Sequence, residues 1–232
     1  IVSRDWSSDV CSSDLCVVLK IYMVLEVNRM ILSKSFLMQQ AEKRNISEYG
    51  TKKEQILFEN VELSTRYDSV NNMKVREYDI FLSHSSLDKK LVLTLVDLFN
   101  EAGYSVYVDW IEDTQLDRSK VNKNTAQVLR NRMNSSKGLA YVATTNATNS
   151  KWCPWELGYF DGKKNSRCCI LPIMESQNFH GQEYLGLYPY LEYAEYSNKN
   201  QYEFWVDNQE NDEYATLREW LNGKEQIGRA SC

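Results

Sequence analysis

The sequence has few of the side chains on which metal centres and disulfide frameworks depend. It contains two His and six Cys among 232 residues, and no two Cys stand in a C-x-x-C spacing. Two histidines argue against a His-based metal site, and zinc sites are usually recognised by paired Cys spacings. The Cys positions are irregular, and Cys168 and Cys169 are adjacent, a spacing that rarely closes a disulfide. We therefore expect reduced thiols, as in a cytoplasmic protein, and no bound metal.

A strongly basic surface and long apolar runs are also missing. The net charge at pH 7 is −5, with no block of Lys and Arg, so we expect no nucleic-acid partner. No apolar run approaches the ~18 residues that a membrane span needs. Residues 16–27 are apolar but contain Glu26 and precede no small-residue cleavage site, which argues against a signal peptide. These absences, with 43% hydrophobic and 25% charged residues, favour a globular cytoplasmic protein.

The two ends of the chain read unlike the rest. Residues 1–15 (IVSRDWSSDVCSSDL) and the final IGRASC look like translated sequencing adapter. We therefore expect residues 1–15 and 226–232 to be artefacts and leave them out of the fold. On this hypothesis the native start is Met30. The alternative is a genuine Ser/Asp-rich tail, which a continuous natural reading frame upstream of Met30 would establish.

Residues 16–75 form an extension before the main pattern begins. Residues 31–45 carry apolar side chains at helical spacing, including Phe36 and Leu37, and predict one short helix. A second helix or strand is expected near residues 56–63. The extension contains no motif that carries chemistry, so a packing arm is favoured over a partner-docking arm.

From Tyr78 onward, short apolar strands alternate with amphipathic helices. The expected strands are residues 78–84, 104–110, 138–146, 167–173 and 191–196, and the expected helices are residues 85–103, 124–136, 150–163 and 213–223. The first helix has leucines at helical spacing: Leu87, Leu91, Leu95 and Leu98. The alternation predicts an α/β domain at residues 76–225, with a flavodoxin-like, doubly wound, five-stranded and mainly parallel sheet covered by helices on both faces.

This topology predicts where a ligand binds. In the flavodoxin-like order the first and third strands are neighbours, and the chain reverses direction between them. Ligands bind in the crevice at the carboxyl ends of those strands. The loops after Leu82 and after Thr144, which read SHSSLDK and TNATNSKWCPWE, should therefore line the site.

Three segments, in this order, resemble the boxes of TIR (Toll/interleukin-1 receptor) domains. YDIFLSHSSLDK resembles the first box, and VYVDW resembles the second strand and its exit. SKWCPWELGYF contains Trp152 and Glu156 in the W-x-x-x-E arrangement of enzymatic TIR domains. The likeness extends to the final helix, and it is greatest to stand-alone bacterial TIR proteins rather than to receptor domains.

The resemblance implies that NAD+ is a substrate and that no cofactor is needed. NAD+ would be hydrolysed or cyclised, giving nicotinamide and either ADP-ribose or a cyclic isomer. Some bacterial relatives make such molecules as alarm signals in anti-phage defence of the Thoeris type, which implies a downstream effector that senses the product. The resemblance also implies self-association through TIR–TIR contacts, in which the loop at residues 111–122 takes part besides helping to gate the site. A solvated loop is the plainer alternative.

The implied chemistry needs one well-placed carboxylate. Trp152 and Glu156 are four residues apart and share a helix face, and Pro154 suits a first turn, where a missing N–H is tolerated. Cleavage of the glycosidic bond builds positive charge on the ribose, which a carboxylate beneath the ring stabilises. Nicotinamide leaves as a neutral molecule, so no general acid is required. We expect Glu156 to be catalytic and Trp152, rather than Trp155, to wall the ribose pocket or stack on a ring.

Further candidate substrate-binding residues follow the first two strands. Ser83, His84 and Ser85 can hold a phosphate at a helix start, although capping of that helix explains the Ser residues equally well. Asp109 and Trp110 end the second expected strand, where they either contact the nicotinamide side of NAD+ or anchor the next loop.

Two other functions fit parts of the pattern. A non-enzymatic adaptor would signal by TIR–TIR association alone, but pure adaptors often lack an acid at the position of Glu156. A phospho-receiver shares the topology, but it needs an acidic cluster after the first strand and an Asp ending the third. This chain has Ser83 and His84 at the first place and Thr144 and Thr145 at the second. The sequence therefore favours an enzyme that cleaves NAD+.

Overall fold

The computed structural model describes residues 29–30, 32–47, 76–113, 122–163, 167–174, 183–195, 202–208 and 213–224. The strands are β1 (Arg29–Met30), β2 (Tyr78–Ser83), β3 (Val106–Tyr107), β4 (Ser136–Ala143), β5 (Cys168–Pro172), β6 (Tyr190–Glu195), β7 (Tyr202–Asn208) and β8 (Glu213–Thr216). The helices are α2 (Lys34–Lys43), α4 (Lys89–Glu101), α5 (Asp109–Glu112), α6 (Lys123–Asn134), α7 (Thr145–Thr148), α8 (Cys153–Lys163) and α9 (Leu217–Leu221), with 3₁₀ turns η2 (Ser86–Asp88) and η3 (Glu183–Leu187). The expectations for the two ends, for residues 56–63 and for most of the loop at 111–122 lie outside the described residues.

One sheet organises the chain, with its strands in the order β3-β2-β4-β5-β6-β7-β8 and β1 beside β6. The strands from β3 to β6 run parallel, as predicted. The first and third strands of the alternating pattern, β2 and β4, are neighbours, and Ser83 pairs with Tyr141. Their carboxyl ends therefore meet at one edge of the sheet. The described part of the chain adds antiparallel strands β1, β7 and β8 to the five that were predicted.

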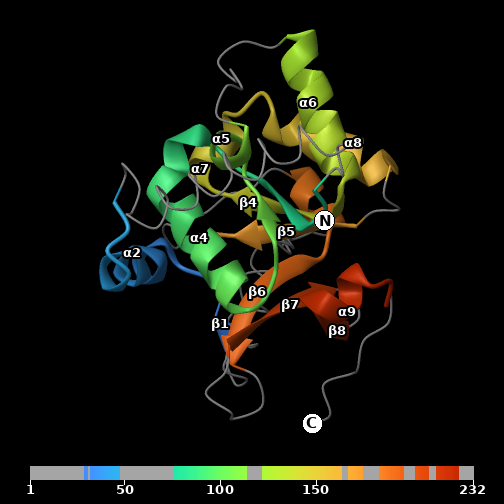
Figure 1. Ribbon diagram of the computed structural model, residues 1–232. Coiled ribbons are helices and arrows are strands. Elements are labelled where there is room, and N and C mark those ends of the chain that lie inside the picture. Colours follow the sequence, from blue (N-terminus) through green and yellow to red (C-terminus); the bar gives the residue numbers. More distant parts are fainter. Residues whose placement is uncertain are drawn as a thin grey trace, which may run out of the picture.

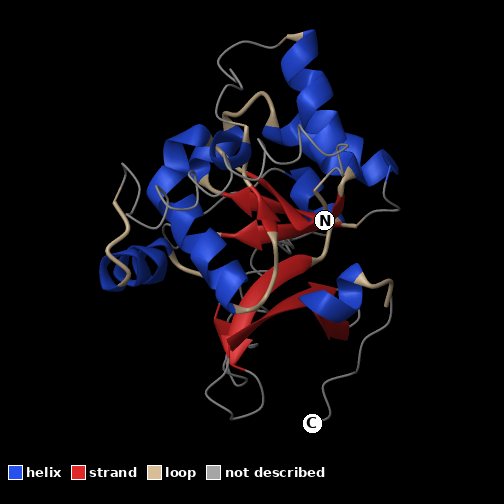
Figure 2. Cartoon of the chain, in the orientation of Figure 1, coloured by secondary structure: helices blue, strands red, loops and turns tan. Residues whose placement is uncertain are grey.

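Side chains of the central strands alternate between two apolar clusters, one on each face of the sheet. On β2, Ile80 and Leu82 belong to the first cluster and Phe81 belongs to the second. Helix α4 contributes to the first cluster, whereas α6 and α8 contribute to the second. Figures 1 and 2 show helices on both sides of the strands. Covering on both faces explains the continuous apolar runs in the sequence.

The second strand is shorter than predicted. β3 contains only Val106 and Tyr107, because the backbone turns into α5 at Asp109. The N–H of Glu112 donates to the carbonyl of Val108 at 3.0 Å, which is a helical hydrogen bond. Asp109 and Trp110 therefore open a helical turn and do not end a strand. The strand-like pattern of residues 104–108 continues into this turn, so the sequence pattern alone does not show where the strand ends.

The predicted final helix at residues 213–223 is two elements. Its first part is strand β8, and only Leu217–Leu221 form α9. Thr216 separates them, because its side chain accepts a hydrogen bond from the N–H of Glu219 at 3.2 Å and caps the helix. The helix packs closely over β4: a Cβ at Gly138 would lie 2.5 Å from the side chain of Leu221.

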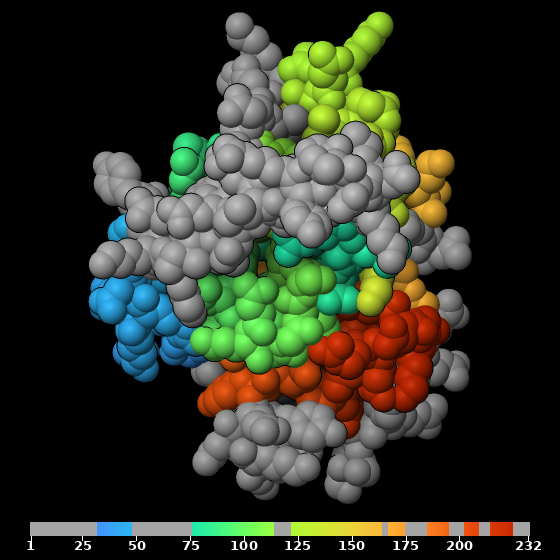
Figure 3. Space-filling view, viewed as in Figure 1, coloured from blue at the N-terminus to red at the C-terminus, as the bar shows by residue number. Residues whose placement is uncertain are grey.

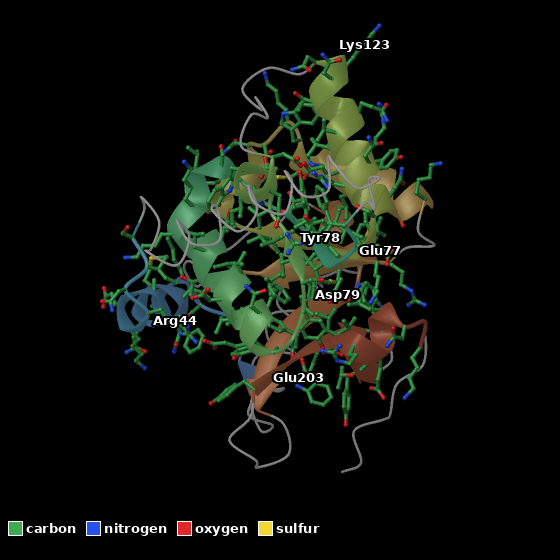
Figure 4. All side chains as sticks on the ribbon, viewed as in Figure 1. Arg44, Glu77, Tyr78, Asp79, Lys123 and Glu203 are labelled. Atoms are coloured by element: carbon green, nitrogen blue, oxygen red, sulfur yellow. The ribbon has the colours of Figure 1, made fainter. Side chains whose placement is uncertain are left out.

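The extension before Arg76 contains the predicted short helix, α2, which is part of the folded unit. Leu37 and Ala41 are fully buried in the same cluster as α4. Arg44 at the end of α2 pairs with Glu101 at the end of α4, with 2.7 Å between Nη2 and Oε2. Figure 3 shows α2 beside α4 on the surface, and Figure 4 labels Arg44 on α2. These contacts agree with a packing arm.

One leucine of the expected helical stripe is placed differently. Leu91, Leu95 and Leu98 are buried, but Leu87 is 76% exposed. The reason is that α4 begins at Lys89, and Leu87 belongs to the preceding 3₁₀ turn, which has a different phase. The stripe therefore begins at Leu91. Gly103, with φ of 82°, follows the helix as expected for a terminator.

Candidate active site

The candidate catalytic carboxylate, Glu156, lies in the first turn of α8 and has 0% of its surface exposed. The helix begins at Cys153, three residues after the predicted start at Ser150, whose Oγ accepts hydrogen bonds from the N–H groups of Trp152 and Cys153, each at 3.2 Å. Pro154 follows in the first turn, where no N–H is required. The start of a helix favours negative charge, so the backbone stabilises a carboxylate at this position.

Glu156 meets the carboxyl end of β2. Ser83, the last residue of β2 and also fully buried, donates a hydrogen bond from Oγ to Oε2 of Glu156 at 2.7 Å. A buried carboxylate is unfavourable unless hydrogen bonds compensate it, and this bond has the short length of a charge-assisted one. The structure therefore joins the predicted carboxylate to the predicted strand end at the edge that the topology indicated.

His84, Asp109 and Trp110 form a second group beside the first. His84 is 2% exposed, with Nδ1 2.8 Å from the carbonyl oxygen of Leu82 and Nε2 2.9 Å from Nε1 of Trp110. The indole N–H can only donate, so Nε2 accepts and Nδ1 carries the proton. Asp109 Oδ1 lies 3.4 Å from the same Nε2. The structure thus brings together three residues that the sequence placed at the ends of two separate strands.

Ser85 caps the turn that follows. Its Oγ accepts a hydrogen bond from the N–H of Leu87 at 3.3 Å, which caps η2. The side chain is 7% exposed. Capping, one of the two roles open for this residue, is therefore present, and a contact with phosphate stays a prediction.

The two tryptophans at the start of α8 have different surroundings. Trp152 is 6% exposed and belongs to the second apolar cluster. Its ring meets Trp155 edge to face, with 5.5 Å between centroids. Trp155 is partly buried and stacks on Tyr159, and the Arg130 guanidinium lies 5.3 Å from the Trp155 centroid. A contact of Trp152 with a ribose or base ring stays a prediction.

Three further polar residues of the same edge, two of them buried, were not singled out by the sequence. The Asp88 carboxylate accepts a hydrogen bond from Thr144 Oγ1 at 2.6 Å and another from Asn146 Nδ2 at 2.6 Å. Asp88 is 7% exposed and Thr144 is 0% exposed. These bonds join the loop after β2 to the loop after β4. A sequence signal existed, since both loops are polar and the topology places them at one edge, but local spacing does not say which members pair.

A network of rings and charges holds the end of α5. Tyr107 donates to Asp113 at 2.7 Å, and Arg132 of α6 makes two hydrogen bonds to the same carboxylate at 2.9 and 2.8 Å. Burial, and then the charge of Asp113, raise the pKa of Tyr107 above its ordinary value. Tyr78 likewise donates to Glu112 at 2.8 Å. Both carboxylates anchor the chain just before residue 114, and the described residues resume at Asn122, which caps α6.

The cysteines of the described ranges are buried thiols. Cys153, Cys168 and Cys169 are free and buried, and burial raises the pKa of the Cys169 thiol above its ordinary value, which keeps it protonated.

No group of three or more His, Cys, Asp or Glu residues capable of holding a metal ion occurs in the described part of the chain. Nor does any helix in the same ranges combine the length and apolar character that crossing a membrane requires.

The match to a known protein family covers all residues of the candidate site. Residues 80–221 match the family model described as "TIR domain". "Probable 3′ cyclic ADP-D-ribose synthase ThsB′" from Bacillus cereus (strain MSX-D12) is 48% identical over 162 residues, which are 68% of this chain and 82% of the relative. "Putative cyclic ADP-D-ribose synthase TIR2" from Cytobacillus dafuensis is 34% identical over 53% of this chain and 33% of its own length. "Probable 2′ cyclic ADP-D-ribose synthase TcpO" from Methanobrevibacter olleyae is 31% identical over 50% of this chain and 31% of its own length.

Proposed function

Because this chain belongs to the TIR domain family, we propose that it cleaves the bond between nicotinamide and ribose in NAD+ and releases a cyclic ADP-ribose. Three relatives are named as cyclic ADP-D-ribose synthases, and the chain spans 82% of the one that is 48% identical. That relative's name specifies the 3′ isomer, so we expect the 3′ product. ADP-ribose is the product where water takes the place of the internal nucleophile.

The observation that carries the proposal is the Ser83–Glu156 pair at the carboxyl edge of the sheet. As the glycosidic bond breaks, its electron pair leaves with nicotinamide, which becomes neutral, and the ribose takes up positive charge. A carboxylate held beneath that ring stabilises the charge. A hydroxyl of the adenosine ribose, or water, then attacks the same carbon, and its proton passes to solvent. Ser83 holds the Glu156 carboxylate ready for this step.

The remaining candidate residues have proposed roles in binding NAD+. Trp152 walls the ribose side, and Asp109 and Trp110 face the nicotinamide side, where His84 accepts a hydrogen bond from Trp110. Ser85, at the start of η2, contacts a phosphate in addition to its capping role. NAD+ is the substrate, and the proposed chemistry requires no cofactor or metal.

The burial of Glu156 bears on how the substrate enters. Its carboxylate has no exposed surface, so NAD+ reaches it only after neighbouring groups move apart. We infer that self-association of the TIR domain drives this rearrangement and that activity rises with protein concentration. We further propose a cytoplasmic location and a role in anti-phage defence, in which an effector senses the product.

Nicotinamide release from NAD+ by the purified chain tests the proposal. We expect turnover that increases at high protein concentration and falls at least ~100-fold in Glu156→Gln, which keeps the shape of the side chain and removes its charge. Glu192→Gln is the matched control, because Glu192 is also buried, at 6% exposure, but lies in β6. Chromatography against standards, with mass spectrometry, identifies the cyclic isomer. Wild-type turnover no faster than Glu156→Gln at every concentration would leave only an association module.

A further inference from the structure

The Asp88 carboxylate has an unusual position for an acidic side chain at the start of a helix. It is 7% exposed and does not cap α4 with a side-chain hydrogen bond. Both of its oxygens instead accept bonds at 2.6 Å from the other loop of the site, one from Thr144 and one from Asn146. Bonds of this length to a charged acceptor are the strong kind, so the pairing is favoured over capping.

Thr144 carries the link onward into the chain that follows β4. Its Oγ1 donates to Asp88 and accepts a hydrogen bond from the N–H of Ala147 at 3.1 Å, which caps α7. α7 ends at Thr148. The N–H of Ser150 donates to the carbonyl of Ala147 at 3.0 Å, and Ser150 Oγ accepts a hydrogen bond from the N–H of Cys153, the first residue of α8. A continuous series of hydrogen-bonded groups therefore runs from Asp88 to the helix that carries the catalytic carboxylate.

A second buried hydrogen bond, between Ser83 at the end of β2 and Glu156 in α8, lies at the same edge. The end of β2 and the loop after it thus hold the segment after β4 at two points. At one point the Ser83 hydroxyl donates to the Glu156 carboxylate. At the other, the Asp88 carboxylate accepts hydrogen bonds from the Thr144 hydroxyl and the Asn146 amide. With both present, neither α7 nor the start of α8 can shift relative to β2 without breaking a buried bond.

We propose that Asp88 is a positioning residue for the NAD+ reaction and that it acts through Thr144 to hold α8, and with it Glu156, at the end of β2. This inference rests on the proposed function for its kinetic consequence. A displacement of about 1 Å in a reacting group lowers rates by ~100-fold, whereas binding of the rest of the substrate is less sensitive. Loss of Asp88 therefore lowers kcat much more than it raises KM.

The kinetic test compares Asp88→Asn with Thr144→Val, an isosteric change that removes the hydroxyl. We expect each to lower kcat by roughly 10–100-fold with KM within ~3-fold. The double variant should lose no more than the larger of the two single losses, because both changes act on the same hydrogen bond. Thr144→Ser, which keeps the hydroxyl, should recover most of the kcat that Thr144→Val loses.

Asp79→Asn, in β2, is the matched control. Asp79 accepts hydrogen bonds from Ser105 and Lys137, lies at the opposite end of β2, and is labelled there in Figure 4. We expect it to lower the melting temperature and leave kcat unchanged below that temperature. Equal kcat losses in Asp79→Asn and Asp88→Asn at matched stability would overturn the positioning role, as would multiplied losses in the double variant.

Hydrogen–deuterium exchange tests the link without turnover. Asp88→Asn and Thr144→Val should both accelerate exchange of backbone N–H groups in residues 145–157, while Asp79→Asn leaves that segment as in the wild type. Unchanged exchange at 145–157 in both variants would refute the link even in an active enzyme. If the wild type fails to cleave NAD+ but the exchange result holds, the proposed function is wrong and the Asp88 link is right.

Discussion

Replacement of Ser83 by alanine perturbs the site through a single hydrogen bond. Ser83→Ala removes the hydroxyl that donates to Glu156 at 2.7 Å and leaves a fully buried carboxylate oxygen without that donor. A hydrogen bond to a charged group contributes about 1.5–3 kcal/mol. At roughly 2–4 °C per kcal/mol for a chain of this size, the melting temperature should fall by about 3–12 °C. Because Glu156 is then less restrained, we also expect kcat to fall by ~10-fold.

We expect the charge of the Glu156 carboxylate to strengthen this bond, and replacing Glu156 isolates that contribution. In a Glu156→Gln background, the same Ser83→Ala change breaks only a neutral hydrogen bond, whose contribution is about 0.5–1.5 kcal/mol. Urea unfolding of the wild type, both single variants and the double variant gives the coupling free energy directly. A Ser83→Ala effect of equal size in both backgrounds, or one below ~0.5 kcal/mol in the wild type, would refute the assignment of a charge-assisted bond.

Two further predictions concern stability. Leu37→Ala empties a fully buried site on α2, so the free energy of unfolding should fall by about 2–5 kcal/mol in urea titrations, against ~0.5 or less for exposed Gln39→Ala; equal effects would contradict the packing of α2 into the fold. Burial, and then the charge of Glu101, raise the pKa of Tyr193 from 10.0 to about 12. The unfolded chain therefore releases this proton first as pH rises, so stability should fall between pH 10 and 12, and Tyr193→Phe should reduce that fall; an identical fall would show that Tyr193 does not contribute.

The central part of the fold follows from apolar periodicity. Segments such as Ile80–Leu82 must be covered on both faces, and that requirement predicts the parallel strands and the neighbouring positions of β2 and β4. β7 was not predicted, although Phe204 and Val206 are buried and Glu203 and Trp205 less so. Its alternation is interrupted by buried Asp207, and a polar residue inside a strand weakens a pattern that depends on hydrophobicity alone.

The predicted boundaries of β3 and α9 were wrong for a different reason. α5 begins at Asp109 through backbone hydrogen bonds, and Thr216 caps α9 with its side chain. The alternation of apolar and polar residues does not encode either feature. The phase of α4 is a related case, since Leu87 fits the helical stripe but precedes the first helical residue. Local patterns therefore predict that an element exists better than they predict where it starts.

The site, too, could be predicted only in part. Sheet topology determines which segments meet, whereas side-chain geometry determines which polar groups form hydrogen bonds. Topology alone brings the end of β2 and the segment after β4 to one edge, and Glu156 and Ser83 do meet there. Which polar groups bond across the crevice depends on side-chain geometry, so Asp88 and its partner Thr144 carried no local signal. Both pairs join the end of β2 or the loop after it to the segment after β4, and each pair is buried. A movement of α8 large enough to admit NAD+ must therefore break the Ser83 bond, the Asp88 bonds or both. The position of the Glu156 carboxylate thus depends on both segments together and not on the W-x-x-x-E motif alone.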